Sequence, residues 1–201
     1  MTPVYGLVLA GGKSSRMGTD KAALIYNGHA QLKLAYEMTA GVTDRTFVSV
    51  RADQRDEPLR AALPQIVDGE ATAGPVAGIL AAQAAFPDVA WLVVACDLPL
   101  LAPQALEMLL ARRDPDALAT AFTGDVDGLP EPLCAIYEPA SAGPLAEFVK
   151  GGRACPRKFL INHRVTLLGP APGQALANVN TPAEHAALLA AAAAAKAGGH
   201  A

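Results

Sequence analysis

VYGLVLA (residues 4–10) and VAWLVVAC (residues 89–96) are nearly continuous runs of apolar side chains. A strand with one face in water alternates apolar and polar residues, whereas a continuous apolar run is typical of a strand buried on both faces. Strands of that kind lie in the middle of a parallel sheet whose two faces are covered by helices. The two runs therefore predict an α/β fold.

Apolar strand-like segments alternate with helical patterns along the rest of the chain. Because βαβ units have right-handed crossovers, this order predicts a three-layer α/β/α fold with a Rossmann-like, mostly parallel sheet. We expect residues 1–201 to form a single domain. Further strands are expected at residues 46–51, 65–67, 117–122, 133–137 and 165–168, and helices at residues 30–41, 57–62, 75–86, 103–113, 142–150 and 181–195.

The composition excludes several classes of protein. The 201 residues include 16 Lys and Arg against 19 Asp and Glu, and 52% are hydrophobic, which excludes intrinsic disorder and gives no basic field for nucleic acid or an anionic membrane. No stretch approaches the roughly 20 strongly apolar residues of a spanning helix, and the N-terminus has no secretory signal pattern. Three scattered cysteines indicate a reducing compartment. We expect a soluble, cytoplasmic protein.

The segment LAGGKSSRMGTDK (residues 9–21) follows directly from the first apolar run. Ligands of open α/β sheets bind at the carboxyl ends of the strands, and paired glycines let the backbone approach a ligand closely. Lys13, Arg16 and Lys21 are offset only by Asp20, so the segment suits a polyphosphate. It matches neither the Walker A pattern nor G-x-G-x-x-G. The alternative is a glycine-rich surface turn with solvated cations.

Two carboxylates follow other predicted strands. Asp97 directly follows residues 89–96 and precedes Leu98-Pro99, and Mg²⁺ is commonly bound by one or two carboxylates together with substrate phosphates. Asp68 ends the short strand at 65–67, ahead of AGPVAG (residues 73–78), where Gly before Pro at a helix start suits close approach to a ligand. Capping or turn formation is the alternative for either carboxylate.

These segments together resemble the MobA-type molybdenum cofactor guanylyltransferases. Residues 9–21 are similar to that family's L-A-G-G-x-x-x-R-M-G-x-D-K, and residues 68–78 to its D-x(n)-G-P-L-A-G. Residues 96–99 are similar to its C-D-x-P metal motif, and residues 178–184 to N-V-N-T-P-x-E. The related cytidylyltransferases usually read L-A-A-G, so Gly11 favours guanine. The resemblance extends over nearly the whole chain.

The resemblance implies a nucleotidyltransferase fold and the Mg²⁺-dependent transfer of GMP from GTP to a molybdopterin-type cofactor, with release of pyrophosphate. The N-terminal half would bind the nucleotide and the C-terminal half the pterin acceptor. Molybdoenzyme-maturation proteins are further expected partners. The implied site residues are Arg16, Lys21 and Asp97 for catalysis, Asp97 for the metal, Leu9, Ala10, Gly11, Gly12, Lys21, Asp68 and Asp97 for the nucleotide, and Asn178, Asn180 and Arg157 for the acceptor.

Some residues leave other functions open. The family commonly has Asn where this chain has Arg51, and Arg cannot accept a hydrogen bond from guanine. Arg157 suits an acceptor phosphate or a solvated surface, and Asn180 suits the pterin or a helix cap. The alternatives are transfer from CTP to the same cofactor, transfer of a nucleotide to a sugar phosphate, or an inactive nucleotide-binding module that delivers the cofactor.

Overall fold

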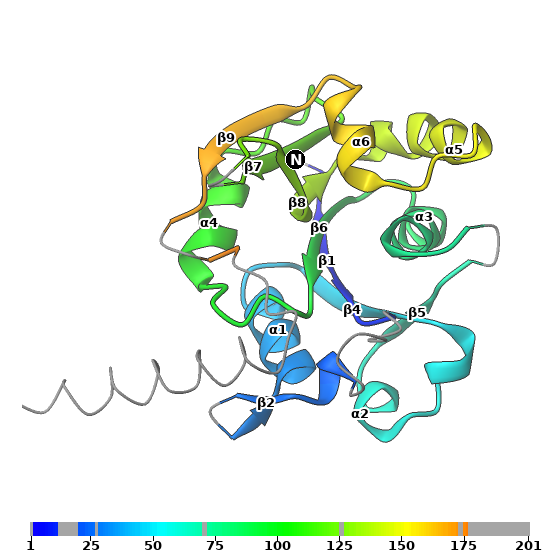
Figure 1. Cartoon of the computed structure of the whole chain (residues 1–201), viewed down its shortest axis with the longest axis vertical. Coiled ribbons are helices and arrows are strands. Elements are labelled where there is room, and N and C mark those ends of the chain that lie inside the picture. The colour runs from blue at the N-terminus through cyan, green and yellow to red at the C-terminus, as the bar shows by residue number, and fades with distance from the viewer. Residues whose placement is uncertain are drawn as a thin grey trace, which may run out of the picture.

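The computed structural model describes residues 2–11, 20–26, 28–69, 72–124, 127–172 and 175–176. One sheet in this part of the chain contains seven strands in the order β5-β4-β1-β6-β8-β7-β9 (Figure 1). A separate two-stranded hairpin pairs β2 (Ile25–Tyr26) with β3 (His29–Ala30). The seven strands are β1 (Val4–Leu9), β4 (Arg45–Val50), β5 (Gln65–Val67), β6 (Ala90–Ala95), β7 (Ala119–Thr123), β8 (Pro130–Tyr137) and β9 (Thr166–Pro170).

The pairing of the strands confirms the predicted mostly parallel sheet. β1 pairs in parallel with β4 on one side and with β6 on the other, and β4 pairs in parallel with β5. β8 is antiparallel to both of its neighbours, β6 and β7, while β7 and β9 are again parallel. Because β8 runs in the reverse direction, it begins at the edge where β6 ends.

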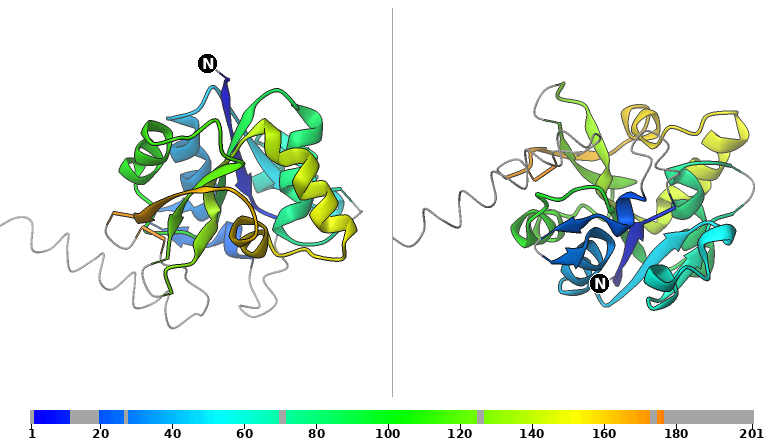
Figure 2. Two further views of the ribbon diagram at one scale, coloured as in Figure 1. Left: turned by 90° about the horizontal axis from the view of Figure 1, so that it is seen from above. Right: turned by 60° about the horizontal axis from the view of Figure 1, so that its bottom comes forward.

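Helices cover both faces of the sheet, so the three-layer arrangement is confirmed (Figures 1 and 2). Apolar side chains of α1 and α4 pack on one face, and those of α3, α5 and α6 pack on the other. Pro at the first helical position, where no amide hydrogen bond is lost, starts four of the helices. The bounds are α1 (Gln31–Ala40), α2 (Pro58–Ala61), α3 (Pro75–Ala85), α4 (Pro103–Ala111), α5 (Ala142–Lys150) and α6 (Pro156–Ile161), with 3-10 turns η1 (Lys21–Ala23), η2 (Ala52–Gln54) and η3 (Pro139–Ser141).

The two apolar runs that predicted the fold form its centre. Every residue of β6 is buried, with Trp91 and Val93 in one core and Leu92 and Val94 in the other. The helix expected at residues 181–195 lies outside the described part of the chain. Within that part, no helix has the length and apolar content needed to cross a membrane.

A buried ion pair joins α4, β8 and the N-terminal segment at the edge where β1 begins. The guanidinium of Arg113 donates to both carboxylate oxygens of Glu138, at 2.6 and 2.7 Å, and to the carbonyl of Thr2 at 2.8 Å. The side chains of Arg113 and Glu138 are only 7% and 2% exposed. Removing one member of such a pair leaves the other charge buried without compensation.

We therefore expect Arg113→Met to lower the free energy of unfolding by about 3–5 kcal/mol. The matched control is Lys150→Met, which removes an ion pair with Glu147 whose two side chains are largely exposed and which should cost at most about 1 kcal/mol. Urea unfolding of both variants measures the difference. Equal losses in the two variants would contradict a structural role for the buried pair.

Candidate functional site

Four parallel strands end at one edge of the sheet, and a charged or glycine residue lies within two positions of the end of each. The backbone pairing continues past the strand ends: the Ala10 amide donates to the Ser49 carbonyl at 3.0 Å, and the Asp68 amide to the Val50 carbonyl at 2.8 Å. A pocket lies at this edge, lined by residues from the ends of β1, β4, β5 and β6, the start of α3 and the start of β8. The pocket includes four of the residues predicted to form the site, namely Leu9, Gly11, Asp68 and Asp97.

Asp68 lies inside the pocket rather than at a solvent-exposed turn. Its carboxyl accepts a hydrogen bond of 2.5 Å from the hydroxyl of Ser49, on the neighbouring strand β4. Burial raises the pKa of Asp68, against the opposing effects of the Ser49 hydrogen bond and the positive charge of Arg51. Ser49 was not predicted from the sequence, because a buried serine inside a strand has no pattern of its own.

Glycines allow the chain to approach Asp68 and Ser49 from two sides. A Cβ at Gly11 would lie 2.8 Å from Asp68 Oδ2, and a Cβ at Gly78 would lie 2.2 Å from Ser49 Oγ and 3.1 Å from Asp68 Oδ1. A Cβ atom less than 3.0 Å from another heavy atom would force a neighbouring group to shift. An alanine at position 11 would therefore displace the Asp68 carboxyl, and Gly78 lets α3 pack directly on β4.

Arg51 connects the strand end of β4 to the start of the glycine-rich segment. Its guanidinium donates to the carbonyl of Gly11 at 2.6 Å and, from two nitrogens, to both carboxylate oxygens of Asp53 at 2.8 and 2.9 Å. Arg51 also lines the pocket. Arg51, which departs from the pattern that the sequence otherwise resembles, thus fixes the backbone at Gly11 on one side of the pocket.

The N-terminus of α3 completes one wall of the pocket. Gly74 has a φ of 80°, in the left-handed region that favours glycine, and Pro75 begins the helix. Both residues line the pocket. Because the first amides of a helix have no partner within it, this end of α3 provides a positive partial charge beside the site.

Asp97 follows β6 at the pocket edge and is the residue that can hold a divalent cation. No cluster of three or more His, Cys, Asp or Glu side chains suitable for a metal occurs among the described residues. The single carboxylate of Asp97 fits a Mg²⁺ ion that takes its remaining ligands from substrate phosphates and water. It does not fit a metal site whose ligands all come from the protein.

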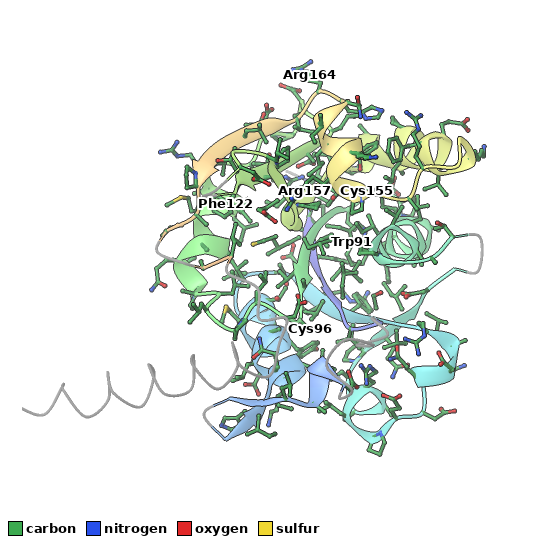
Figure 3. The ribbon with its side chains drawn as sticks, viewed as in Figure 1. Trp91, Cys96, Phe122, Cys155, Arg157 and Arg164 are labelled. Atoms are coloured by element: carbon green, nitrogen blue, oxygen red, sulfur yellow. The ribbon has the colours of Figure 1, made fainter. Side chains whose placement is uncertain are left out.

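Arg157 lies on the same edge of the sheet, at the start of α6 and beside β8 (Figure 3). Its guanidinium donates to Glu131 at 2.8 Å and to Asp127 at 3.3 Å, and its side chain is 35% exposed. Arg153, four residues earlier in the chain, lies over the ring of Phe148 at 4.3 Å. These two arginines therefore contact different parts of the protein.

The structure describes only some of the remaining predicted site residues. Ala10 lies between β1 and Gly11 and is buried, and the backbone of Lys21 begins η1. The side chain of Lys21 lies outside the described atoms. Gly12, Arg16, Asn178 and Asn180 lie outside the described residues altogether.

Comparison with known proteins identifies the family. Residues 6–167 match the family model described as the MobA-like NTP transferase domain. The chain belongs to this family. Family membership confirms the predicted nucleotidyltransferase class and the resemblance on which it was based.

Two curated relatives and a solved structure extend this finding. A molybdenum cofactor biosynthesis bifunctional protein of Synechocystis is 36% identical, over 92% of this chain but only 53% of that protein, so this chain spans about half of it. A probable molybdenum cofactor guanylyltransferase of Trichormus variabilis is 30% identical, over 94% of this chain and 91% of that protein. Molybdopterin-guanine dinucleotide biosynthesis protein A of Archaeoglobus fulgidus has the same fold, with a TM-score of 0.78 and 24% identity over 94% and 98% of the two chains.

Asp68→Asn should have opposite effects on the stability of the protein and on its affinity for nucleotide. Because the pKa of Asp68 is raised in the folded protein, its contribution to stability is present at low pH and is lost as pH rises through the raised pKa. The stability of the variant relative to wild type should therefore increase as pH rises through that window. Its nucleotide affinity should fall at least about tenfold, by loss of a charged hydrogen-bond acceptor.

Thermal unfolding between pH 4 and 8 and nucleotide titration at pH 7.5 measure the two effects. Asp116→Asn, at an exposed position far along the chain, is the control and should retain wild-type affinity. Unchanged affinity in Asp68→Asn would exclude Asp68 from the nucleotide site.

Proposed function

We propose that this MobA-like NTP transferase transfers GMP from GTP to the terminal phosphate of a molybdopterin-type cofactor, releasing pyrophosphate. The observation that carries the proposal is the convergence of Gly11, Asp68 and Asp97 on one pocket at the carboxyl ends of parallel strands. The curated relatives named as guanylyltransferases support the same reaction. We further propose that residues 1–201 act as one domain, located in the cytoplasm.

Guanine recognition is assigned to Asp68 and Arg51, on either side of Gly11. Guanine presents N–H donors on its Watson–Crick edge and acceptors at O6 and N7, and Arg is the usual partner of O6 and N7. The Asp68 carboxyl accepts from the donors of the base. Arg51 has five N–H donors, of which the Gly11 carbonyl and Asp53 engage three, and it donates from the others.

The triphosphate extends from the base toward Asp97. Asp97 would hold Mg²⁺, which when bound would supply positive charge to the substrate phosphates. In our proposal Leu9, Ala10, Gly11 and Gly12 border the nucleotide, backbone amides from Gly11 onward hold it, and Arg16 and Lys21 neutralise the phosphates.

The acceptor approaches from the C-terminal half of the chain. Because β8 runs antiparallel to β6, its first residues and Leu133 lie at the edge that carries Asp97. Arg157, Asn178 and Asn180 are proposed to bind the acceptor on this side. A phosphate monoester is already anionic at neutral pH, so its oxygen attacks the α-phosphorus in line without a general base, and the protein acts through positioning and charge. The product then passes to molybdoenzyme-maturation proteins.

Turnover measurements test this function. Purified protein with Mg²⁺, GTP and the molybdopterin-type cofactor should release pyrophosphate, and CTP should support a slower reaction, because guanine matches the donor and acceptor groups of the pocket. Faster turnover with CTP would identify a cytidylyltransferase. Nucleotide binding without pyrophosphate release with either the cofactor or a sugar phosphate would identify a binding module.

Asp97→Asn is the variant that ties this activity to the site. It should lower kcat by about 10²–10³-fold, because it removes an electrostatic contact made at the reacting phosphates, while its unfolding midpoint stays near that of wild type. Asp88→Asn is the matched control, since Asp88 is exposed just before the opposite end of the same strand and should retain full activity. Near-normal Mg²⁺-dependent activity in Asp97→Asn would refute the metal assignment.

A further inference from the structure

Arg60 is a buried charge that the proposed reaction does not use. It lies in α2, between β4 and β5, and its side chain is only 1% exposed. All three guanidinium nitrogens donate hydrogen bonds. Nε and one terminal nitrogen donate to the carbonyl of Ala10 at 3.3 and 2.8 Å, and both terminal nitrogens donate to the two carboxylate oxygens of Asp20 at 2.7 and 3.1 Å. One terminal nitrogen also donates to Glu57.

Ala10 and Asp20, two partners of Arg60, lie on either side of one segment of the chain. Ala10 precedes and Asp20 follows the segment that carries Gly11, Gly12 and Arg16. A single guanidinium therefore binds both ends of this segment from a helix 40 to 50 residues further along the chain. Neither end can move away without leaving a buried donor unpaired, which is costly.

Asp20 transmits this constraint to the residue that follows it. Its carboxylate accepts a hydrogen bond from the Ala22 amide at 3.1 Å, and its carbonyl accepts one from the Ala23 amide at 3.0 Å. These bonds fix the turn η1, which begins with Lys21. Burial acts to raise the pKa of Asp20, but the hydrogen bonds from Arg60 and Ala22 and the positive charge of Arg60 hold that pKa below its usual range. Asp20 is thus an anion at neutral pH.

The guanidinium of an arginine is suited to contacting Ala10 and Asp20 at the same time. Arginine is planar and presents its donors in a fixed fork, whereas lysine places three donors on one point charge. Only a fork can bind a carboxylate with two nitrogens and at the same time donate to a carbonyl on another segment. A loop held in its binding geometry before the ligand arrives avoids the ordering cost on binding.

The structure assigns to Arg60, acting with Asp20, the role of a positioning residue: it holds in place Ala10 and Asp20, which flank the segment proposed to bind the nucleotide. This assignment deepens the proposed function, on which it rests for the identity of the ligand. Arg60 does not touch the substrate. It fixes the backbone at Ala10 and Asp20 and so positions the adjoining backbone of Gly11 and Lys21, which are proposed to bind GTP.

The chain contains a matched control for this assignment. Arg113 has the same pattern of contacts, a bidentate bond to a carboxylate and a bond to a main-chain carbonyl, at the opposite edge of the sheet. Arg60→Lys and Arg113→Lys should both lower the unfolding midpoint. Only Arg60→Lys should affect the nucleotide, raising the KM for GTP and lowering kcat/KM by about 10²-fold through misplacement of binding groups.

Amide hydrogen exchange in the nucleotide-free protein gives a readout that does not depend on the reaction. Exchange at the amides of Ala22 and Ala23 should accelerate in Arg60→Lys and in Asp20→Asn, and should remain as in wild type in Arg113→Lys. Asp20→Asn preserves the volume and keeps Arg60 in place, so it supplies the test if Arg60→Lys does not fold.

Faster exchange together with weaker GTP binding in Arg60→Lys or Asp20→Asn supports the assignment. Unchanged exchange overturns it, as does faster exchange with wild-type affinity and KM, since the contact would then be structural only. If wild type prefers another nucleotide, the proposed substrate fails, and the same comparison of affinities is made with that nucleotide.

Discussion

The parallel pairing of β1 with β4 and β6 is the constraint on which the rest of the molecule depends. Its register aligns Leu9 with both Ser49 and Ala95, so the segments that follow these strands leave the sheet at one edge. Parallel strands need crossover connections, and the helices of those connections cover both faces. The same pairing that buries β1 and β6 therefore also creates the crevice in which Gly11, Asp68 and Asp97 meet.

Buried arginines stabilise this sheet at both edges, with different consequences. Arg113 and Glu138 join secondary elements at the edge where no site is proposed. Arg60 makes equivalent contacts near the pocket edge, with Ala10 and Asp20, which flank the segment proposed to bind the nucleotide. A buried ion pair is costly to assemble. We infer that the buried charge of Arg60 offsets its unfavourable desolvation by also positioning the segment proposed to bind the nucleotide.

The sequence predicted the sheet well, because continuous apolar runs and β-rich segments are local signals. It missed α6, which is only six residues long, and the β2–β3 hairpin, whose strands have two residues each. It did not predict the direction of β8, because hydrophobic patterns carry no strand direction. At the site, Asp68 and Asp97 were found from their positions after strands. Ser49 and Arg60 were not, because their roles come from partners 19 to 50 residues away.

We expect a guanine nucleotide to occupy the pocket at the carboxyl ends of β1, β4, β5 and β6, with its base at Asp68 and its phosphates at Asp97. A crystal structure of the protein with Mg²⁺ and a non-hydrolysable GTP analogue tests it most directly. The expected result is electron density for the base against Gly11 and Asp68, and a metal within about 2.1 Å of an Asp97 oxygen, as Mg²⁺ coordination requires. Nucleotide density elsewhere on the molecule, or a metal bound away from Asp97, would contradict it.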